Sequence, residues 1–321
     1  MTVELRPPFL CLLFLLLSSV CAGAEKVRFA IPSRSVSIMP IFVAFKEGFY
    51  RDEDMDVEII NMSSQMALQA TLAGSVDFSS SPGSATNAAV RGIDFKTIFV
   101  VGRKPLHDLI THPGIRSFGD LKGKIVGVDT FGSMSDFLTR GMLGKNGLEP
   151  DRDVAVRMVG TDNLRIAALK NGIVSASVMT LPYNFLAVKD GFRRLAYAGD
   201  YEEVIIGGVV TTGKLMKDDP GKVARFVRAT LKGLNFYKAD KAKSLLHMTE
   251  FLKIQDNHFL EASYDYHRAT LTDGGIISSK LMERVIDDAK RFTKTDRDVK
   301  KEDIFDFSLA EKFRAQSKRT P

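Results

Sequence analysis

The sequence of 321 residues contains no tryptophan and only two cysteines, Cys11 and Cys21. Without tryptophan, the protein cannot stack a ligand on an indole ring. Both cysteines lie within the first 24 residues, so cleavage of that segment would remove every disulfide, thiolate nucleophile and cysteine-based metal site. After residue 24, no apolar run approaches the ~20 residues that a membrane-spanning helix needs. We therefore expect a soluble mature protein.

Motifs of several other function classes are also missing. The net charge of +6 is spread along the chain without a block of Lys and Arg between aromatic residues, which argues against nucleic-acid binding. Ser133-Met134-Ser135 does not match a hydrolase nucleophile elbow, and Gly123-Lys124 lacks P-loop spacing. No histidine shows metal-ligand spacing, so we expect no metal and no cofactor. All five histidines are expected at the surface or at a hinge: His107, His112, His247, His258 and His267.

Residues 1–24 predict a secretory signal peptide. Arg6 stands near the start, an apolar run extends from Phe9 to Leu17, and Ala22-Gly23-Ala24 resembles a cleavage site. The alternative is a lipoprotein anchored through Cys21, but the preceding Ser18-Ser19-Val20 fits a lipidation site poorly. The hydrophobic fraction of 45% and the charged fraction of 26% are those of an ordinary globular protein. We therefore expect an exported protein.

Short apolar strands alternate with helices over the first two thirds of the chain. This order indicates βαβ units and a mostly parallel sheet. After Asp219-Pro220, which fits a helix N-cap followed by proline at the first helical position, the pattern is helical. The expected strands lie at 27–31, 57–60, 76–79, 95–101, 125–128, 154–159, 173–179, 194–198 and 204–210.

The segment from Asp120 to Leu138 contains a candidate anion site. Ile125 to Val128 suits a buried strand, and Ser133 with Asp136 fits an N-cap and capping box at the start of a helix. The N-terminus of such a helix presents free N–H groups and a partial positive charge, which favour an anionic group. The alternative is a plain strand-to-helix connection that binds nothing.

Two segments, 98 positions apart, repeat one order of residues. Leu72 to Ser79 reads as helix end, Gly74, strand and serine loop, and Leu169 to Ala176 repeats that order around Gly172. Chance similarity is the alternative. A true repeat implies two lobes of like construction, whose loops beyond the strand ends face one another across a cleft.

Four segments in order carry a resemblance to a known family. They are Ala44-Phe45-Lys46-Glu47-Gly48-Phe49-Tyr50, Leu72-Ala73-Gly74-Ser75-Val76-Asp77, Asp120-Leu121-Lys122-Gly123-Lys124-Ile125-Val126-Gly127-Val128 and Phe305-Asp306-Phe307-Ser308. In order and spacing, the chain resembles the solute-binding proteins of ABC transporters in the nitrate/sulfonate/taurine group, which also contains thiamin-pyrimidine-precursor proteins. Val174-Ser175-Ala176 departs from this pattern, because family members often carry an acidic residue after the valine.

The resemblance implies a two-lobed α/β fold of the type II periplasmic-binding class, with hinge crossings near Lys104 to Leu109 and Glu203 to Gly208. Lobe 1 would comprise residues 25–105 and 205–321, and lobe 2 residues 106–204. The resemblance also implies a periplasmic monomer without catalytic activity. Such a protein captures a small-molecule ligand by hinge closure and docks on an ABC permease in the inner membrane.

Family ligand loops map to four places in this sequence, where hydroxyls and helix N-termini would converge on a small oxyanion, sulfonate or carboxylate. Arg34 would clamp the anion, Asp162 would receive an amine unless it only caps a helix, and Tyr183 would cover an organic ligand unless it lies on the lobe surface. The implied ligand-binding residues are Ser33, Arg34, Ser35, Ser37, Ser80, Ser81, Gly83, Ser84, Thr130, Gly132, Ser133, Ser135, Thr161, Asp162, Thr180 and Tyr183.

Two other functions are open. The first is an enzyme similar to the thiamin-pyrimidine synthases of the same fold, which use a Cys-rich iron-binding motif and an active-site histidine. The mature chain has no cysteine and is expected to be secreted, which argues against this enzyme. The second is an extracytoplasmic sensor or accessory binding protein without a transporter of its own. Neighbouring genes for a permease and an ATPase would favour the importer.

Overall fold

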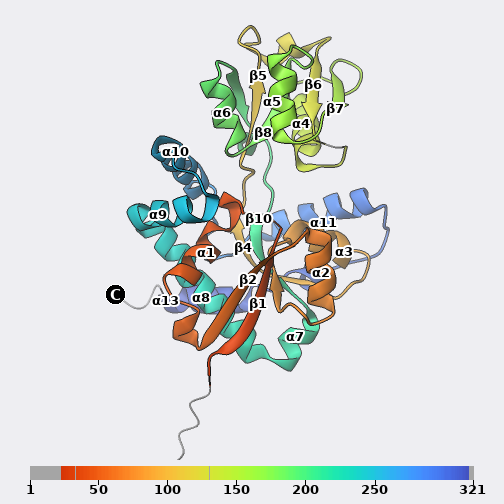
Figure 1. Ribbon diagram of the computed structural model, residues 1–321. Coiled ribbons are helices and arrows are strands. Elements are labelled where there is room, and N and C mark those ends of the chain that lie inside the picture. The colour runs from red at the N-terminus through yellow and green to blue at the C-terminus, as the bar shows by residue number, and fades with distance from the viewer. Residues whose placement is uncertain (1–22, 33, 130, 318–321) are drawn as a thin grey trace, which may run out of the picture.

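The computed structural model describes residues 23–32, 34–129 and 131–317. Residues 1–22 of the predicted signal peptide, including Cys21, lie outside these ranges, as do Ser33 and Thr130 of the predicted ligand loops. Figure 1 shows a larger and a smaller lobe, each built on one sheet and joined by two extended segments. These connections comprise residues 103–106 and 201–205.

The larger lobe contains a five-stranded sheet in the order β2-β1-β3-β10-β4. β1 (Glu25–Ile31) pairs in parallel with β2 (Met55–Asn61) and β3 (Phe78–Ser79). β10 (Ile206–Thr211) runs antiparallel between β3 and β4 (Lys96–Gly102). Four of the five strands therefore run in one direction, which confirms the expectation of a mostly parallel sheet.

The smaller lobe repeats this plan in the order β7-β6-β8-β5-β9. β6 (Ile125–Val128) pairs in parallel with β7 (Ala155–Met158) and β8 (Ala176–Thr180). β5 (His107–Thr111) runs antiparallel between β8 and β9 (Arg193–Tyr197). β3 and β8 thus hold equivalent central positions, which agrees with the repeat detected between the segments that lead into them.

Helices cover both sheets. In the larger lobe, α1 and α8 share a core with β1, while α3 and α11 pack in a second core with Val100 and Val210. The helices are α1 Met39–Lys46, α2 Ser64–Leu72, α3 Pro82–Ala89, α4 Met134–Lys145, α5 Asp162–Lys170, α6 Tyr183–Lys189, α7 Gly213–Asp218, α8 Pro220–Ala239, α9 Lys241–Leu252, α10 Asn257–Arg268, α11 Ser279–Thr293, α12 Lys301–Ile304 and α13 Ser308–Ser317.

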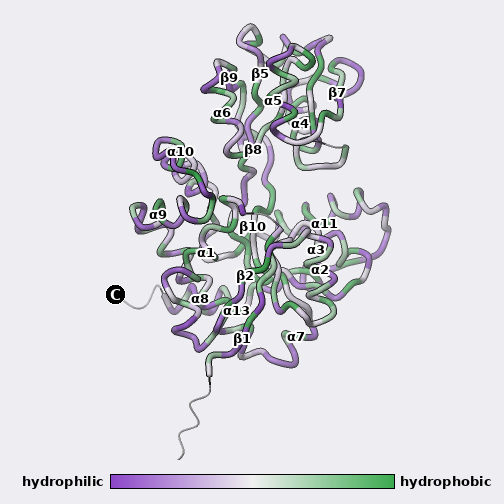
Figure 2. The backbone as a smooth tube through the Cα atoms, in the orientation of Figure 1, coloured by the Kyte–Doolittle hydropathy of each residue, from purple (hydrophilic) through white to green (hydrophobic). Residues whose placement is uncertain are grey.

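An aromatic stack holds α8 on the larger sheet. The centre of the Phe226 ring lies 4.1 Å from that of Phe78 and 4.8 Å from that of Tyr50, and all three side chains are buried. The Tyr50 hydroxyl shares a hydrogen bond of 2.9 Å with Thr230, so burial leaves its polar group satisfied. Figure 2 shows hydrophobic residues along the strands at the centre of this lobe.

Three expectations from the sequence differ from the structure. The strand predicted at 173–179 begins only at Ala176, because Gly172 adopts a positive φ and the chain is still turning away from α5. The predicted crossing near Lys104 to Leu109 overlaps β5, which begins at His107. His267 is fully buried in α10 rather than at the surface or a hinge. Among the described residues, no helix is long and apolar enough to cross a membrane.

Candidate ligand-binding cleft

A cavity of about 460 Å³, the central cavity, lies where the two lobes meet. The larger lobe contributes the loop after β1 and the N-terminus of α3, and the smaller lobe contributes the starts of β5 and α4 and the end of β8. These loops converge because parallel strands end at the same edge of their sheet. The lining residues that carry hydroxyl groups are Ser35, Ser37, Ser64, Ser81, Ser84 and Thr180.

The N-terminus of α3 provides hydrogen-bond donors on one wall. Pro82 at the first helical position fixes where the helix starts, and the N–H groups of Gly83 and Ser84 lie in the first turn, where no helix carbonyl accepts them. Ser80 and Ser81 are each 5% exposed, and their hydroxyls have no hydrogen-bond partner among the described residues. Of the two, only Ser81 lines the cavity. An unpaired buried polar group costs about 1–3 kcal/mol, so a ligand that bonded to the Ser81 hydroxyl would gain affinity.

The central cavity carries no formal charge on its described lining residues, which include no Asp, Glu, Lys or Arg. Burial and the nearby charge of Arg165 lower the pKa of His107 from its ordinary value to about 3. The imidazole of His107 is therefore neutral near pH 7 and has one donor and one acceptor nitrogen. A negative charge on a ligand would meet hydroxyl and backbone dipoles here rather than an ion pair.

A second cavity of about 550 Å³, the side cavity, borders the central cavity. Its walls are mostly apolar and come from α6 in the smaller lobe and from the segment joining α9 to α10 in the larger lobe. Arg34 and Tyr183, both predicted ligand contacts, line this cavity. The guanidinium carbon of Arg34 lies 6.0 Å from the centre of the Phe251 ring. The residues that line both cavities are Ser35, Val36, Thr180 and Leu181.

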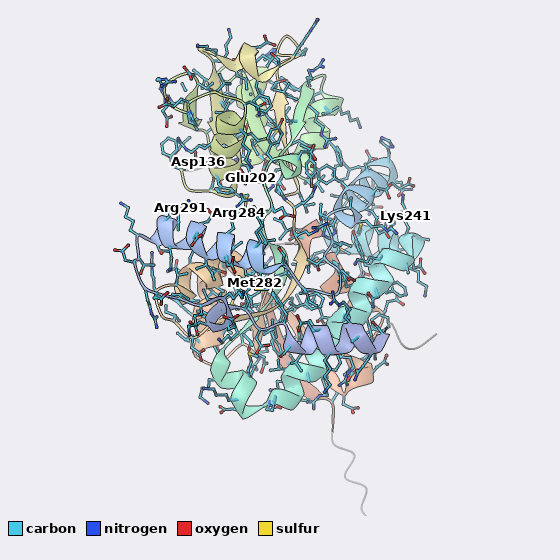
Figure 3. All side chains as sticks on the ribbon, turned by 180° about the vertical axis from the view of Figure 1, so that it is seen from behind. Asp136, Glu202, Lys241, Met282, Arg284 and Arg291 are labelled. Atoms are coloured by element: carbon cyan, nitrogen blue, oxygen red, sulfur yellow. The ribbon has the colours of Figure 1, made fainter. Side chains whose placement is uncertain are left out.

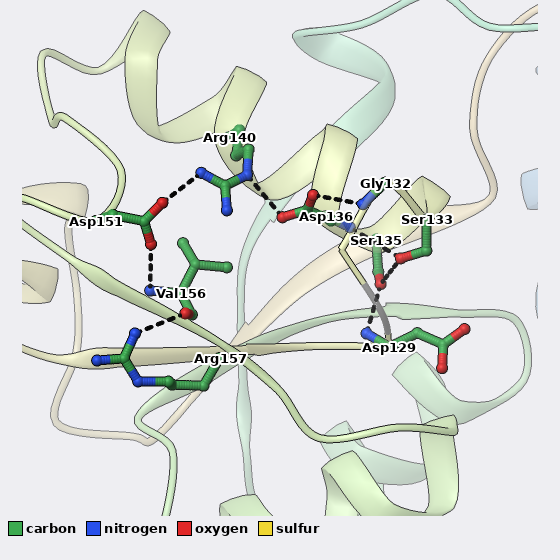
Figure 4. Close-up of polar contacts among 9 residues, drawn as sticks. All are labelled: Asp129, Gly132, Ser133, Ser135, Asp136, Arg140, Asp151, Val156 and Arg157. Atoms are coloured by element: carbon green, nitrogen blue, oxygen red, sulfur yellow. Dashed lines mark hydrogen bonds and ion pairs between the residues drawn. The ribbon is translucent and has the colours of Figure 1, made fainter. Parts of the chain in front are cut away.

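The predicted anion site at the N-terminus of α4 is filled by the chain itself (Figure 4). The Ser133 hydroxyl accepts the N–H of Asp136 at 3.3 Å, which confirms the N-cap. The Asp136 carboxylate accepts the N–H of Gly132 at 2.8 Å and Arg140 Nε at 2.7 Å, so the predicted capping box with Ser133 is not formed. Because a buried carboxylate already stands at the positive end of α4, a second anion there would be repelled.

The carboxylate of Asp162, at the first position of α5, also has partners within the chain. Its Oδ1 accepts Arg165 Nη2 at 2.5 Å and the N–H of Thr180 at 3.3 Å. The N-cap of α5 is Thr161, so the alternative that Asp162 only caps the helix is wrong. Burial raises the pKa of Asp162, and the charge of Arg165 opposes that rise. The carboxylate thus holds the end of β8 against α5 and already has a counter-charge.

A third cavity of about 210 Å³ lies between the loop before α4 and the helix α11. Phe292 of α11 packs on that loop, since a methyl group added to Gly132 would come within 2.9 Å of the ring. Glu202, which is 6% exposed, pairs with Arg284 of α11 (Figure 3). It also pairs with Lys145 of α4. These contacts reach from one lobe to the other. A movement of the lobes relative to each other would therefore change the contacts of α11.

A family model described as NMT1/THI5 like matches residues 35–244, which is more than half of the chain. The chain belongs to the NMT1/THI5-like family. A search of curated proteins finds no significant match.

Solved structures show the fold of this family member. A putative periplasmic sulfonate-binding protein, SsuA from Methylobacillus flagellatus KT, is 18% identical with a TM-score of 0.75, covering 93% of this chain and 96% of its own. The periplasmic aliphatic sulphonate-binding protein SsuA from Escherichia coli is 19% identical with a TM-score of 0.71, covering 84% and 92%. The desulfurization enzyme DszB is 12% identical with a TM-score of 0.70, covering 91% and 99%. At these identities the likeness shows the fold alone, which is that of the periplasmic binding proteins.

The predicted ligand residues of this NMT1/THI5-like protein are divided among the three cavities. The side cavity contains Arg34 and Tyr183, and the third cavity contains Gly132 and Ser133. The central cavity brings together Ser35, Ser37, Ser81, Gly83, Ser84 and Thr180. The described residues that line none of the three are Ser80, Ser135, Thr161 and Asp162.

Sequence reasoning missed Ser64, Met134 and His107, which also line the central cavity. His107 reaches it because β5 places this residue opposite Thr180 in the strand register. The family resemblance placed residues 104–109 at a hinge crossing, so the strand register that brings the histidine to Thr180 was not expected. The apolar pair Leu109-Ile110 was the one local signal for a strand here, and a strand predicted around it would have included His107.

Proposed function

We propose that this protein is the extracytoplasmic solute-binding component of an ABC importer, which captures a small anionic solute between its lobes and delivers it to a membrane permease. The observation that carries the proposal is the central cavity, whose wall combines the first turn of α3 with the unpartnered hydroxyl of Ser81. Membership of the NMT1/THI5-like family and the periplasmic-binding-protein fold support it.

An oxyanion suits this wall. Sulfonate, carboxylate and nitrate groups accept several hydrogen bonds, and a helix N-terminus with hydroxyls stabilises negative charge without a cation. The neutral imidazole of His107 would add one donor. Proteins of this fold from M. flagellatus and E. coli are named as sulfonate-binding proteins, so sulfonates are the first ligands to test.

Capture by lobe closure is expected because both lobes contribute walls to the central cavity. We assign residues 25–105 and 205–321 to lobe 1 and residues 106–204 to lobe 2, with the two connections as hinges. A ligand in the central cavity contacts both lobes only when they are close together, and this differential affinity shifts the population towards the closed form. The closed form of a monomer, located in the periplasm, would then present a defined surface to the permease.

We propose a binding role rather than catalysis, although one protein of this fold, DszB, is an enzyme. The described lining of the central cavity offers a single histidine, His107, and no carboxylate to orient it as a base. A sensor or accessory protein without a permease would use the same cavity. Binding of the detergent-solubilised permease only to the ligand-loaded protein would separate the importer from the sensor.

The test is a thermal-shift screen of protein that has been unfolded and refolded to remove any carried-over ligand. The panel contains nitrate, taurine, alkanesulfonates, aromatic carboxylates and pyrimidine precursors. A ligand at about a hundred times its Kd should add about 2.7 kcal/mol to the free energy of unfolding. Small-angle scattering should then show a smaller radius of gyration with that ligand. The absence of a shift with every class in the panel would contradict the proposal.

A further inference from the structure

We propose that the side cavity is a subsite for an apolar body of the ligand, whose anionic head occupies the central cavity. This inference rests on the proposed function and narrows the ligand class. It predicts organic anions that carry a hydrocarbon chain or ring, and it disfavours nitrate and taurine, which have no such body.

The chemistry of the walls is the first argument. Leu186, Leu252, Ile254 and Phe259 contribute apolar side chains to the side cavity. Leu186 is 42% exposed, an apolar surface that a hydrocarbon would cover. Removing such surface from water is the main driving force for binding apolar groups. A small hydrophilic anion would leave this surface wet.

The shared boundary with the central cavity is the second argument. Thr180 and Leu181, at the end of β8, line both cavities, as do Ser35 and Val36 from the opposite lobe. A ligand whose head group is held at the N-terminus of α3 would therefore place its chain in the side cavity by extending past these four residues. The volume of about 550 Å³ lies in the range of small-molecule sites, ~300–1,000 Å³, and far exceeds what nitrate fills.

The origin of the walls in both lobes is the third argument. α6 of the smaller lobe supplies Tyr183 and Leu186. In the larger lobe, the segment after α9 supplies Ile254, and α10 supplies Phe259. The ammonium group of Lys189 in α6 lies 3.9 Å from the carboxylate of Asp256, so the lobes approach one another beside this cavity. A hydrocarbon body between the walls would add contacts to both lobes and favour closure.

Charge at the side cavity does not select the ligand by itself. Arg34 and Asp256, of opposite sign, both line it, and Asp256 is engaged as the N-cap of α10, where it accepts the N–H of Phe259 at 3.1 Å. The selection we infer is therefore by apolar area and length. Each buried methylene is worth about 0.8 kcal/mol, which corresponds to about a fourfold change in Kd.

The experiment measures Kd by titration calorimetry for straight-chain alkanesulfonates and alkanoates of two to eight carbons, with nitrate and taurine alongside. We expect Kd to fall about threefold to fourfold per added methylene until the side cavity is full. Leu186→Gln, which is polar but uncharged, should remove most of this dependence on chain length while leaving the two-carbon ligands within about threefold. The matched control is Leu246→Gln in α9, since Leu246 is 69% exposed and outside the described lining of the cleft.

Four outcomes are informative. A steady fall of Kd with chain length that Leu186→Gln removes and Leu246→Gln keeps supports the subsite. Equal affinity for short and long anions overturns the subsite but leaves the proposed function standing. Equal weakening of all ligands by Leu186→Gln, or the same loss with Leu246→Gln, also overturns it. If nothing in either series binds, and nitrate and taurine do not bind either, the proposed function fails and the subsite fails with it.

Discussion

The hydroxyl of Tyr266 in α10 donates a hydrogen bond of 2.8 Å to Oδ1 of Asp108 in β5, and this bond joins the two lobes beside the first hinge. Asp108 is 1% exposed and also accepts Asn184 Nδ2 at 2.7 Å and Arg194 Nε at 2.9 Å. Burial raises the pKa of Asp108, and the charge of Arg194 opposes that rise. The ring of Tyr266 meets that of Tyr197 edge-on at 5.0 Å. We infer that this cluster keeps the lobes in contact beside the first hinge and acts as the pivot of lobe movement.

Tyr266→Phe should therefore loosen the lobes as well as destabilise the fold. A hydrogen bond to a buried carboxylate is worth about 1.5–3 kcal/mol, so the free energy of unfolding should fall by that order in urea titrations. Scattering should show a wider range of lobe separations. The control is Tyr264→Phe on the same helix, whose hydroxyl donates to the carbonyl of Tyr237 within the larger lobe. The control should lose stability without changing the scattering, and equal scattering changes in both would contradict the hinge role.

Gly83→Asp should abolish anion binding and keep the fold. Open space surrounds a side chain at Gly83, because no atom lies within 4 Å of an added Cβ, and Asp is favoured in the first turn of a helix. Its carboxylate would repel a ligand anion at the central cavity. Gly83→Asn has nearly the same shape without the charge, so it should bind within about tenfold of the unchanged protein. If Gly83→Asn weakened binding as much as Gly83→Asp, the cause would be the size of the side chain and not its charge.

Ser133→Asp should, in contrast, change the affinity for anions by less than about threefold. Ser133 is the N-cap of α4, where Asp is as good a capping residue as Ser, and the Asp136 carboxylate already occupies this helix end. Calorimetric titration with the ligand found in the screen measures the effect. An effect as large as that of Gly83→Asp would return the anion site to α4.

The order of strands and helices could be predicted from the sequence because it depends on local patterns. The run Ile125 to Val128 and the N-cap Asp219 both appear in the structure as expected. β5 was missed because its sequence, His-Asp-Leu-Ile-Thr, opens with two polar residues. One of these, Asp108, is buried among partners from distant parts of the chain, which no local pattern reveals.

The candidate site was predicted in outline only, because its details depend on which side chains pair with one another in the folded protein. The sequence shows hydroxyl residues after strand ends, and several of them do line one cavity. It does not show that Asp136 turns back to Gly132, or that Arg165 pairs with Asp162. Nor does it show the apolar side cavity, whose walls come from α6 and from the segment after α9.

Two glycines of α4 should respond in opposite ways to alanine. Nothing lies within 4 Å of an added Cβ at Gly144, so Gly144→Ala should stabilise the fold by about 0.4–1 kcal/mol through lower chain entropy. At Gly141 the added Cβ would come within 2.7 Å of Oε1 of Glu202, the buried carboxylate that pairs with Lys145 and Arg284. Gly141→Ala should therefore gain nothing or lose stability in urea titrations. An equal gain at both positions would contradict the packing between α4 and Glu202.

His267 should make the fold less stable as the pH falls from 7 to 5. Burial lowers the pKa of His267 in the folded state to about 3, from an ordinary value of 6.5. Between these values the unfolded chain binds more protons than the folded protein, so the free energy of unfolding is largest above pH 6.5 and falls as the pH decreases. The loss should be about 2 kcal/mol at pH 5 for this one residue, since one pKa unit corresponds to 1.36 kcal/mol. His107, whose pKa is also lowered to about 3, should add a similar loss.

Urea titrations at pH 7 and pH 5 measure the contribution of His267 by comparison with His267→Gln, which does not titrate. The substitution lowers stability at both pH values, because the Tyr237 hydroxyl loses its partner at 3.1 Å. The quantity to compare is therefore the change between the two pH values, which should be smaller by about 2 kcal/mol in the variant. The unchanged protein, titrated at the same two pH values, is the reference. If His267→Gln loses as much stability between pH 7 and pH 5 as the unchanged protein, His267 is not the buried neutral group that the structure shows.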